Sequence, residues 1–142
     1  MFRGNHPTRV DEKGRLKMPA DFKRELAEEQ EFYITSTDGK RAQLYPMAEW
    51  EKKEAALEKM PSTHPARIRF LDVTSYYGQV TKMDTQGRLL LPQLLREEAN
   101  VTGDVVVLGK QTILEVINHI NFKPETKPLT ADEMKVLADF GL

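Results

Sequence analysis

The 142-residue sequence contains no cysteine. This absence excludes disulfides, thiolate metal sites and cysteine nucleophiles, and it fits a protein of the reducing cytoplasm. Long apolar runs are missing too. The longest aliphatic stretches, Leu89 to Leu91 and Val105 to Leu108, are too short for a membrane span or a signal peptide. With 8 glycines and 8 prolines, the composition excludes collagen-like and disordered chains. We therefore expect one ordinary folded domain or two very small ones, with a cytoplasmic location.

Patterns of catalytic or metal-binding residues are also lacking. The three histidines, His6, His64 and His119, lie far apart and show no metal-ligand spacing. No serine occupies a nucleophile-elbow context, and no glycine-rich phosphate loop is present. The sequence therefore predicts a protein that is not an enzyme and that uses no metal, cofactor or small-molecule substrate.

Charge is present in quantity but is distributed unevenly. The net charge is only −1, yet residues 1–24 hold seven basic and three acidic residues, and the remaining chain is correspondingly acidic. A basic end on an acidic body is the electrostatic footprint expected for binding a polyanion, and self-association would multiply it. The alternative reading is a basic terminus that is merely solvated. Charge alone does not separate the two.

The sequence repeats itself at an offset of 73 residues. Residues 11–19, Asp-Glu-Lys-Gly-Arg-Leu-Lys-Met-Pro, return at 84–92 as Asp-Thr-Gln-Gly-Arg-Leu-Leu-Leu-Pro. A polar helical stretch follows each copy and leads to a strand-like run, at Phe32 to Thr35 and at Val105 to Leu108. Two copies of one supersecondary unit are predicted, each too small to bury its own core. The predicted organisation is a first repeat at 5–48, a helical connector at 49–75, a second repeat at 76–119 and a tail with a short helix at 120–142.

Each repeat contains the signals of a tight turn between two strands. Asp11 and Asp84 are placed to cap backbone amides of the turn, and Gly14 and Gly87 follow three residues later, where a positive φ is needed. These four residues are therefore predicted to shape the turns rather than to act as ligands.

The strand after each turn alternates between apolar and basic residues. Leu16 and Met18 are predicted to face the core, whereas Arg15 and Lys17 face outward, and Arg88 corresponds to Arg15 in the second copy. One face of the ribbon is thus available for binding.

Helices are predicted after and between the repeats. Pro19 and Pro92 end the strands and suit the first turn of a helix. Good helix formers fill Met47 to Met60, and Ala66 to Leu71 predicts a short second helix before a strand that passes through Tyr76 and Tyr77.

These features together resemble a known family. The Asp-x-x-Gly-Arg hairpin, the proline that begins a helix and the strand after it resemble the AbrB/SpoVT-type swapped-hairpin unit. Two such units in one chain, opened by Met-Phe-Arg-Gly and with Leu44-Tyr45-Pro46 and Glu49-Trp50 after the first, are similar to the bacterial regulators of this family that carry a double unit. The resemblance covers about residues 1–118 and implies an α+β fold, in which two swapped-hairpin units form a small β-barrel core with flanking helices.

The resemblance also implies a function. Members bind DNA sequence-specifically, assemble into closed rings and recognise direct repeats in promoter DNA. The expected targets include the protein's own cell-division and cell-wall operon, usually with repression as the outcome, and the expected location is cytoplasmic and nucleoid-associated. The family's DNA-contacting segment, Asp-x-x-x-Arg, falls on Asp11 and Arg15 and again on Asp84 and Arg88.

The candidate DNA-binding residues follow from this reading and from the charge pattern. Lys13, Arg15 and Lys17 place several cations on one hairpin, where phosphate contacts would fix the register and one arginine would read a guanine edge. The second copy has Leu90 in place of the third cation, so the first repeat is predicted to supply most contacts. The full predicted set is Arg3, Arg9, Lys13, Arg15, Lys17, Gln86 and Arg88. The alternative class is a homo-oligomeric scaffold whose basic hairpins grip an acidic protein partner.

Overall fold

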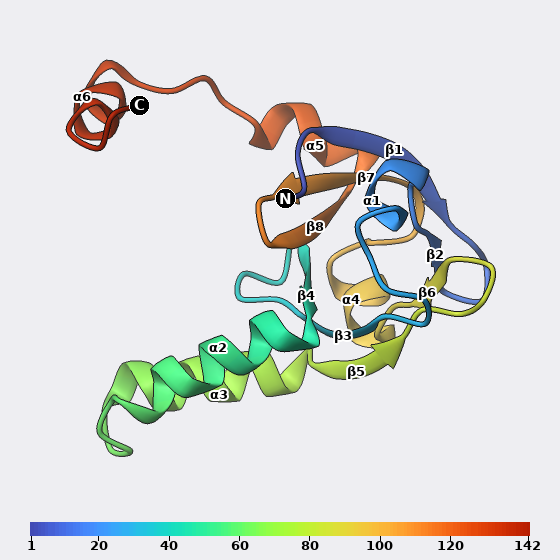
Figure 1. The fold of residues 1–142 in the computed structure, drawn as a ribbon, viewed down its shortest axis with the longest axis horizontal. Helices are drawn as coiled ribbons and strands as arrows, with labels where there is room; N and C mark the ends of the chain where they lie inside the picture. Colours follow the sequence, from blue (N-terminus) through green and yellow to red (C-terminus); the bar gives the residue numbers. More distant parts are fainter.

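The computed structural model describes residues 1–142 as a barrel with projecting helices (Figure 1). The elements in chain order are β1 (Asn5–Val10), β2 (Arg15–Lys17), α1 (Ala20–Lys23), β3 (Glu31–Thr35), β4 (Ala42–Pro46), α2 (Met47–Glu58), α3 (Pro65–Tyr76), β5 (Gln79–Lys82), β6 (Arg88–Leu90), α4 (Gln93–Glu98), β7 (Gly103–Lys110), β8 (Ile113–Asn118), α5 (His119–Glu125) and α6 (Ala131–Ala138).

All eight strands belong to one antiparallel sheet. The strand order is β5-β3-β4-β8-β7-β1-β2-β6. Its two end strands, β5 and β6, are consecutive in the chain and are joined by the turn at 83–87, so the sheet nearly closes into a barrel. The predicted α+β class with a small barrel core is confirmed.

The two repeats exchange strands rather than folding side by side. Strand β1 of the first repeat pairs along its whole length with β7 of the second, from Asn5 opposite Leu108 to Val10 opposite Gly103. In the same way β5 of the second repeat pairs with β3 of the first, and β2 pairs with β6. Neither repeat therefore has a sheet of its own, which agrees with the swapped-hairpin architecture.

The barrel interior is filled by alternate residues of the strands. Leu16 on β2 lies directly opposite Leu89 on β6, and both side chains are fully buried. Phe22 from α1 and Leu95 from α4 are buried in the same cluster, one from each repeat. The predicted inward alternation is thus confirmed, with Met18 buried as well. Burial of this apolar surface is the main stabilising contribution to the fold.

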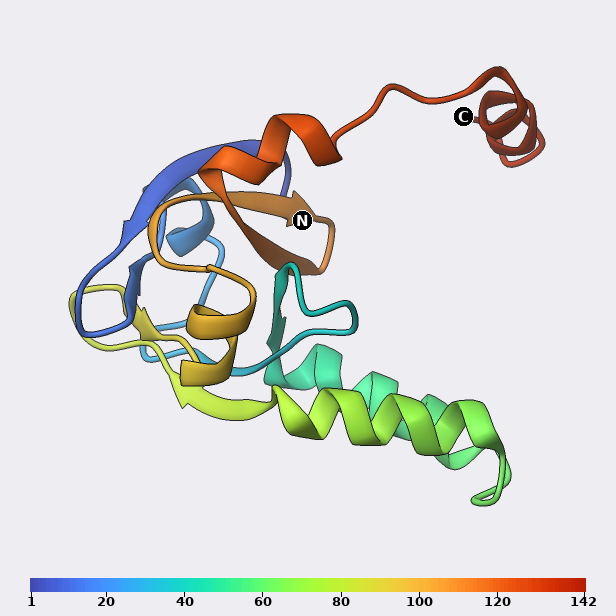
Figure 2. The ribbon, with the colours of Figure 1, turned by 180° about the vertical axis from the view of Figure 1, so that it is seen from behind.

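Helices α2 and α3 form a hairpin that projects from the barrel (Figures 1 and 2). Its base is held by aromatic packing around Trp50, whose ring stacks on Tyr33 at 4.4 Å between centroids and on Phe70 at 6.2 Å. The helix predicted from Met47 is confirmed, and Pro19 and Pro92 directly precede α1 and α4 as predicted.

The strand predicted through Tyr76 and Tyr77 is wrong. Helix α3 runs on to Tyr76, well beyond the predicted end at Leu71, and the strand begins only at Gln79. No residue between Leu71 and Tyr77 breaks a helix, so the helix continues until Gly78. Glycine is required there because a Cβ would collide with the Tyr33 hydroxyl and the Thr74 carbonyl oxygen.

The chain ends in two helices of different character. Helix α5 packs on β7 and β8, whereas α6 stands clear of the barrel at the end of an extended segment (Figure 2). Across the whole chain, no helix combines the length and the hydropathy needed to cross a membrane.

Candidate nucleic-acid interface

Two tight turns, residues 11–14 and 84–87, have the same internal hydrogen bonds. In the first, Asp11 N–H donates to the Arg15 carbonyl at 2.9 Å, and Gly14 N–H donates to the Asp11 carbonyl at 2.9 Å. The Asp11 carboxylate also accepts the backbone N–H groups of Lys13 and Arg15, at 3.0 and 2.9 Å. The second turn repeats these bonds around Asp84. Each aspartate thus fixes the backbone from which an arginine projects.

Each turn aspartate also orients that arginine. Arg15 Nε donates to Asp11 Oδ2 at 2.9 Å, and Arg88 Nε donates to Asp84 Oδ2 at 3.1 Å. About 30% of each arginine side chain is exposed. The bond uses only Nε, and neither guanidinium forms a further hydrogen bond within the chain through its Nη atoms. Both arginines therefore keep their terminal donors for a ligand, in a fixed orientation.

The two turns meet over one basic hollow. It encloses about 390 Å³ and is lined entirely by polar or charged residues, namely Arg9, Asp11, Arg15, Lys17, Gln86 and Arg88. Lys17 and Arg88 are directly opposite each other on β2 and β6. Like charges in cross-strand pairs are unfavourable, so an anion placed between them would relieve repulsion. The turns lie at the end of the barrel remote from α6 and the α2–α3 hairpin (Figure 1).

The turns are braced against each other by the exchanged repeats. Met18 N–H donates to the Gly87 carbonyl, and Leu91 N–H donates to the Gly14 carbonyl, both at 2.9 Å. Gly14 has a φ of +84°, and a Cβ at this position would collide with the guanidinium of Arg96 from α4. The two halves of the interface are therefore held in one fixed relation.

Sequence reasoning missed two residues of this brace. The guanidinium of Arg96 lies against Gly14. In the same way the side chain of Lys23, from the first repeat, lies against Gly87, where a Cβ would be 3.0 Å from Lys23 Cε. Their separation of 73 residues equals the offset of the repeat, and this could have identified them as an equivalent pair. Both bring positive charge beside a turn.

Two of the predicted residues, Lys13 and Arg3, lie outside the hollow. Lys13 is exposed at the tip of the first turn. Arg3 precedes β1, and its backbone lies against Gly109, toward the far end of β1 from Arg9. Arg9 lines the hollow but also forms an exposed ion pair with Asp104 at 2.7 Å. The structure thus gathers the cations of both hairpins and sets Arg3 apart.

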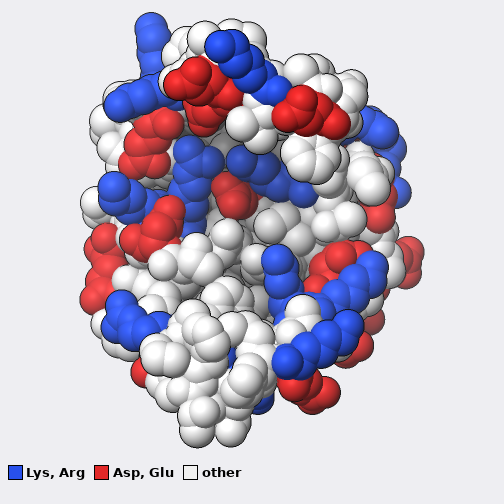
Figure 3. Space-filling view, turned by 90° about the vertical axis from the view of Figure 1, so that its left-hand side faces the viewer, with Lys and Arg blue, Asp and Glu red and all other residues white.

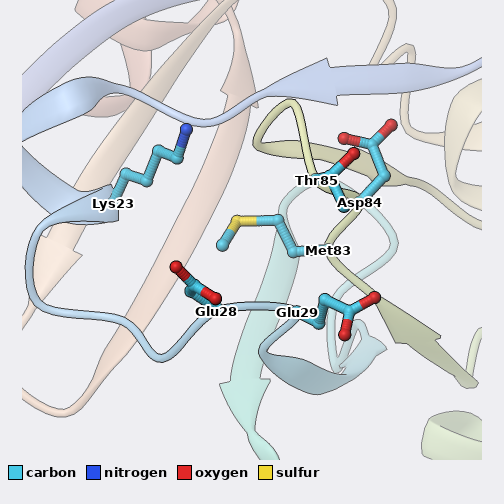
Figure 4. Close-up of a pocket in the computed structure, with 6 residues that line it drawn as sticks. All are labelled: Lys23, Glu28, Glu29, Met83, Asp84 and Thr85. Carbon is cyan, nitrogen blue, oxygen red and sulfur yellow. The ribbon is translucent and has the colours of Figure 1, made fainter.

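A second hollow, of about 430 Å³, borders the other side of the second turn (Figure 4). Its lining comprises Lys23, Glu28, Glu29, Met83, Asp84 and Thr85, with Met83 between the lysine and the glutamates. Three carboxylates and one ammonium group would repel a phosphate backbone. The basic hollow is therefore the candidate interface, and this acidic one is not.

The turn aspartates make the stability of the fold depend on pH. Hydrogen bonds from the backbone N–H of Arg15 and of Arg88 lower the pKa of Asp11 and of Asp84 below the ordinary value of 3.8. A lowered pKa in the folded state gives stability that is complete above the unfolded-state value and is lost as pH falls through the folded-state value. The free energy of unfolding, measured by urea denaturation, should therefore fall less between pH 6 and pH 3 in the double variant Asp11→Asn with Asp84→Asn than in the unmodified chain. An equal loss in both would contradict this role.

The fold and the hollow define a double swapped-hairpin protein with basic side chains gathered at one end of its barrel. A family model described as "MraZ protein, putative antitoxin-like" matches residues 1–73 and 79–130. Relatives named transcriptional regulator MraZ are 60% identical in Acidobacterium capsulatum and 53% identical in Koribacter versatilis, each over the full length of both chains. A third, from Syntrophobacter fumaroxidans, is 32% identical over 98% of this chain and 93% of its own. The chain belongs to the MraZ family.

Proposed function

We propose that this protein is a transcriptional regulator that binds promoter DNA through the basic hollow between its two turns. The observation that carries the proposal is the pair of aspartate-oriented arginines, Arg15 and Arg88, which project from braced turns with their terminal donors unused. The name of its relatives, transcriptional regulator MraZ, supports the same role.

In this proposal, recognition uses two kinds of contact, one with phosphates and one with the edge of a base. The ammonium groups of Lys13 and Lys17 are point charges that suit phosphate oxygens, and Arg9, exposed and paired with Asp104, adds positive charge beside them. Such contacts position the protein on the duplex. The guanidinium of Arg15 presents two parallel donors, the geometry that matches the O6 and N7 atoms of guanine in the major groove. Leu90, opposite Arg15, leaves the second strand with one cation fewer, so the first repeat supplies most contacts.

The finer features of the proposal concern assembly and target. Copies of the chain associate into a closed ring, and adjacent hollows then meet successive direct repeats along the promoter. The regulated genes are the protein's own operon for cell division and wall synthesis, the outcome is repression, and the protein acts on the nucleoid. No catalytic step and no cofactor are involved.

The proposal is tested by titrating labelled upstream DNA with the protein and following fluorescence anisotropy. We expect tight binding to the upstream DNA and weaker binding to a scrambled sequence of equal length. The logarithm of the affinity should fall linearly with the logarithm of salt concentration, because each neutralised phosphate releases counterions at a slope of about −0.9 per contact. A footprint on the same DNA should show protected segments in direct repeat.

Two results would oppose this function. Equal affinity for upstream and scrambled DNA would show that binding is not sequence-specific. An affinity that does not change with salt concentration would show that phosphate contacts do not dominate the binding surface. Absence of any DNA binding, combined with retention of an acidic protein, would favour a scaffold with an acidic partner instead.

A further inference from the structure

A third hollow, of about 400 Å³, lies between the loop at 37–39 and the last turn of α3. Two aspartates, Asp38 and Asp72, and two tyrosines, Tyr76 and Tyr77, line it, together with small or apolar residues. No lysine, arginine or histidine is part of its lining. We call it the tyrosine hollow. Its charge is opposite to that of the basic hollow, so it suits a cationic ligand and disfavours an anion.

Both tyrosine rings of this hollow are held by neighbouring elements. The Tyr76 hydroxyl donates to Glu98 Oε1 on α4 at 2.8 Å, although 53% of the residue is exposed. Tyr77 packs against the core cluster, and a Cβ at Gly39 would lie 2.6 Å from its hydroxyl oxygen, so the loop approaches this ring closely. The rings are nearly perpendicular, with centroids 4.9 Å apart. Tyrosine rings fixed beside carboxylates attract cations, and arginine most often provides the cation in such contacts.

The two carboxylates of the hollow retain accepting capacity for a ligand. Asp38 Oδ1 accepts the backbone N–H groups of Lys40 and Arg41, at 2.8 and 3.0 Å, whereas Asp38 Oδ2 accepts no hydrogen bond within the chain. Burial acts to raise the pKa of Asp38, but the hydrogen bonds outweigh it and lower the pKa below 3.8, so this carboxylate is ionised at neutral pH. Asp72 is exposed and forms no ion pair, although Arg69 is one turn away on the same helix.

The end of α3 adds negative potential to the hollow. The partial negative charge at a helix C-terminus favours a nearby cation, which a basic residue of the last turn can supply. Helix α3 has 12 residues and no basic residue in its last turn. The basic residues Lys40 and Arg69 border two neighbouring hollows, and neither lines this one. The chain therefore places no cation of its own in the tyrosine hollow.

The tyrosine hollow lies away from the proposed DNA contacts. It is at the foot of the α2–α3 hairpin, whereas the two turns are at the other end of the barrel (Figure 1). Figure 3 views the side from which the hairpin projects, and there acidic and basic side chains are interspersed rather than gathered into a basic field. A basic partner that approaches this side is therefore not repelled, and DNA on the turns leaves the hollow accessible.

The shape of the surface favours an arginine carried on a peptide over a small free cation. A smaller hollow of about 190 Å³ adjoins the tyrosine hollow, since Thr37 and Val73 border both, and Phe70 contributes to its lining. The two form one groove along α3. An arginine side chain can lay its methylene groups on Val73 while its guanidinium donates to the carboxylates. We propose that the tyrosine hollow binds an arginine side chain on an extended segment of a partner protein, with the flanking residues in the adjoining hollow.

The proposal is tested with a blocked pentapeptide that has a central arginine between alanines and glycines and carries a trifluoroacetyl group. Fluorine NMR line widths, followed during titration with the full chain, give its affinity. A peptide with citrulline in place of arginine has nearly the same shape and no charge. We expect the arginine peptide to bind about tenfold or more tightly than the citrulline peptide, because charged donors form the stronger hydrogen bonds to carboxylates. Equal affinities would overturn the proposal.

Variants of the chain locate the binding site. Tyr76→Leu removes the ring but keeps an apolar side chain and should weaken peptide binding about two- to fivefold, whereas Tyr76→Phe keeps the ring and should retain most of the affinity. Asp72→Asn should also weaken binding about two- to fivefold. Asp132→Asn, the same change on α6, is the matched control and should leave the affinity unchanged. Full affinity in Tyr76→Leu and Asp72→Asn, or equal weakening by the two aspartate variants, would overturn the assignment to this hollow.

A single blocked arginine amide with the same fluorinated group tests whether the ligand is a peptide. The pentapeptide should bind about threefold or more tightly than the amide, because its flanking residues bury apolar surface in the adjoining hollow. Equal affinity of the two would overturn a peptide-borne arginine as the ligand and indicate a free cation. These titrations contain no DNA, so their outcome is independent of the function proposed above.

Discussion

Replacing Arg15 with alanine is expected to weaken binding to upstream DNA by about 1–3 kcal/mol per contacted site, without changing the size of the assembly. The reason is geometric, since Arg15 is held by Asp11 through Nε alone and its terminal nitrogens remain available. Replacing Arg15 and Arg88 together should cost about twice as much and leave no measurable preference over scrambled DNA. Anisotropy titration on both DNAs, with sedimentation velocity for the assembly, measures the effect.

One further variant separates charge from shape at Arg15, and a second, on α2, controls for the loss of one positive charge. Arg15→Lys keeps the charge but loses the planar fork, so it should retain binding to scrambled DNA and lose much of the preference for the upstream sequence. Lys52→Ala removes one positive charge from α2, in an exposed pair with Glu49, and should leave both affinities nearly unchanged. If Arg15→Ala binds upstream DNA like the unmodified chain, the hairpin is not the contact surface.

The local features of this fold could be predicted from the sequence because short-range chemistry determines them. The turns follow from Asp and Gly at a fixed spacing. The beginnings of α1 and α4 follow from Pro19 and Pro92, and the inward face of β2 follows from the alternation around Leu16. The repeat at an offset of 73 residues further predicted equal units. Each of these signals is contained within a few residues of the element it specifies.

Long-range pairing could not be predicted in the same way. Nothing near Asn5 indicates that β1 lies beside β7, almost 100 residues later, and only the family resemblance suggested exchange. The strand predicted at Tyr76 and Tyr77 failed because aromatic residues suit strands and helices alike. Tyr33 decides the end of α3 instead, since its hydroxyl bonds to the Thr74 carbonyl and fills the space beside Gly78.

The candidate site likewise combines features that the local sequence predicts with features that depend on long-range strand pairing. The residues of the hollow were identifiable one by one, but their meeting depends on the pairing of β2 with β6, which brings Lys17 opposite Arg88. The bond from Arg15 to Asp11 had a signal in the sequence, a spacing of four residues in both repeats. Arg3 belonged to the predicted set by charge alone, and its place toward the other end of β1 depends on the register with β7.

The largest expected loss of stability comes from the point where the two repeats meet in the core. Leu16 and Leu89 face each other across β2 and β6, both fully buried, so Leu89→Ala should lower the free energy of unfolding by about 2–5 kcal/mol. Leu90→Ala is the matched control, since Leu90 is the next residue on the same strand and is half exposed, and its cost should stay near or below about 0.5 kcal/mol. Urea denaturation of both variants at one protein concentration makes the comparison, because association would otherwise shift the midpoint.

A double variant shows whether the repeats share one core at this point. Because Leu16 and Leu89 are cross-strand neighbours in one packed interior, the combined loss for Leu16→Ala with Leu89→Ala should differ from the sum of the single losses by about 0.5 kcal/mol or more. Strict additivity would mean that each repeat packs independently, contrary to the exchange of strands. The spacing between Arg15 and Arg88, which the proposed DNA recognition requires, would then depend on the backbone pairing of β2 with β6 and not on the shared core.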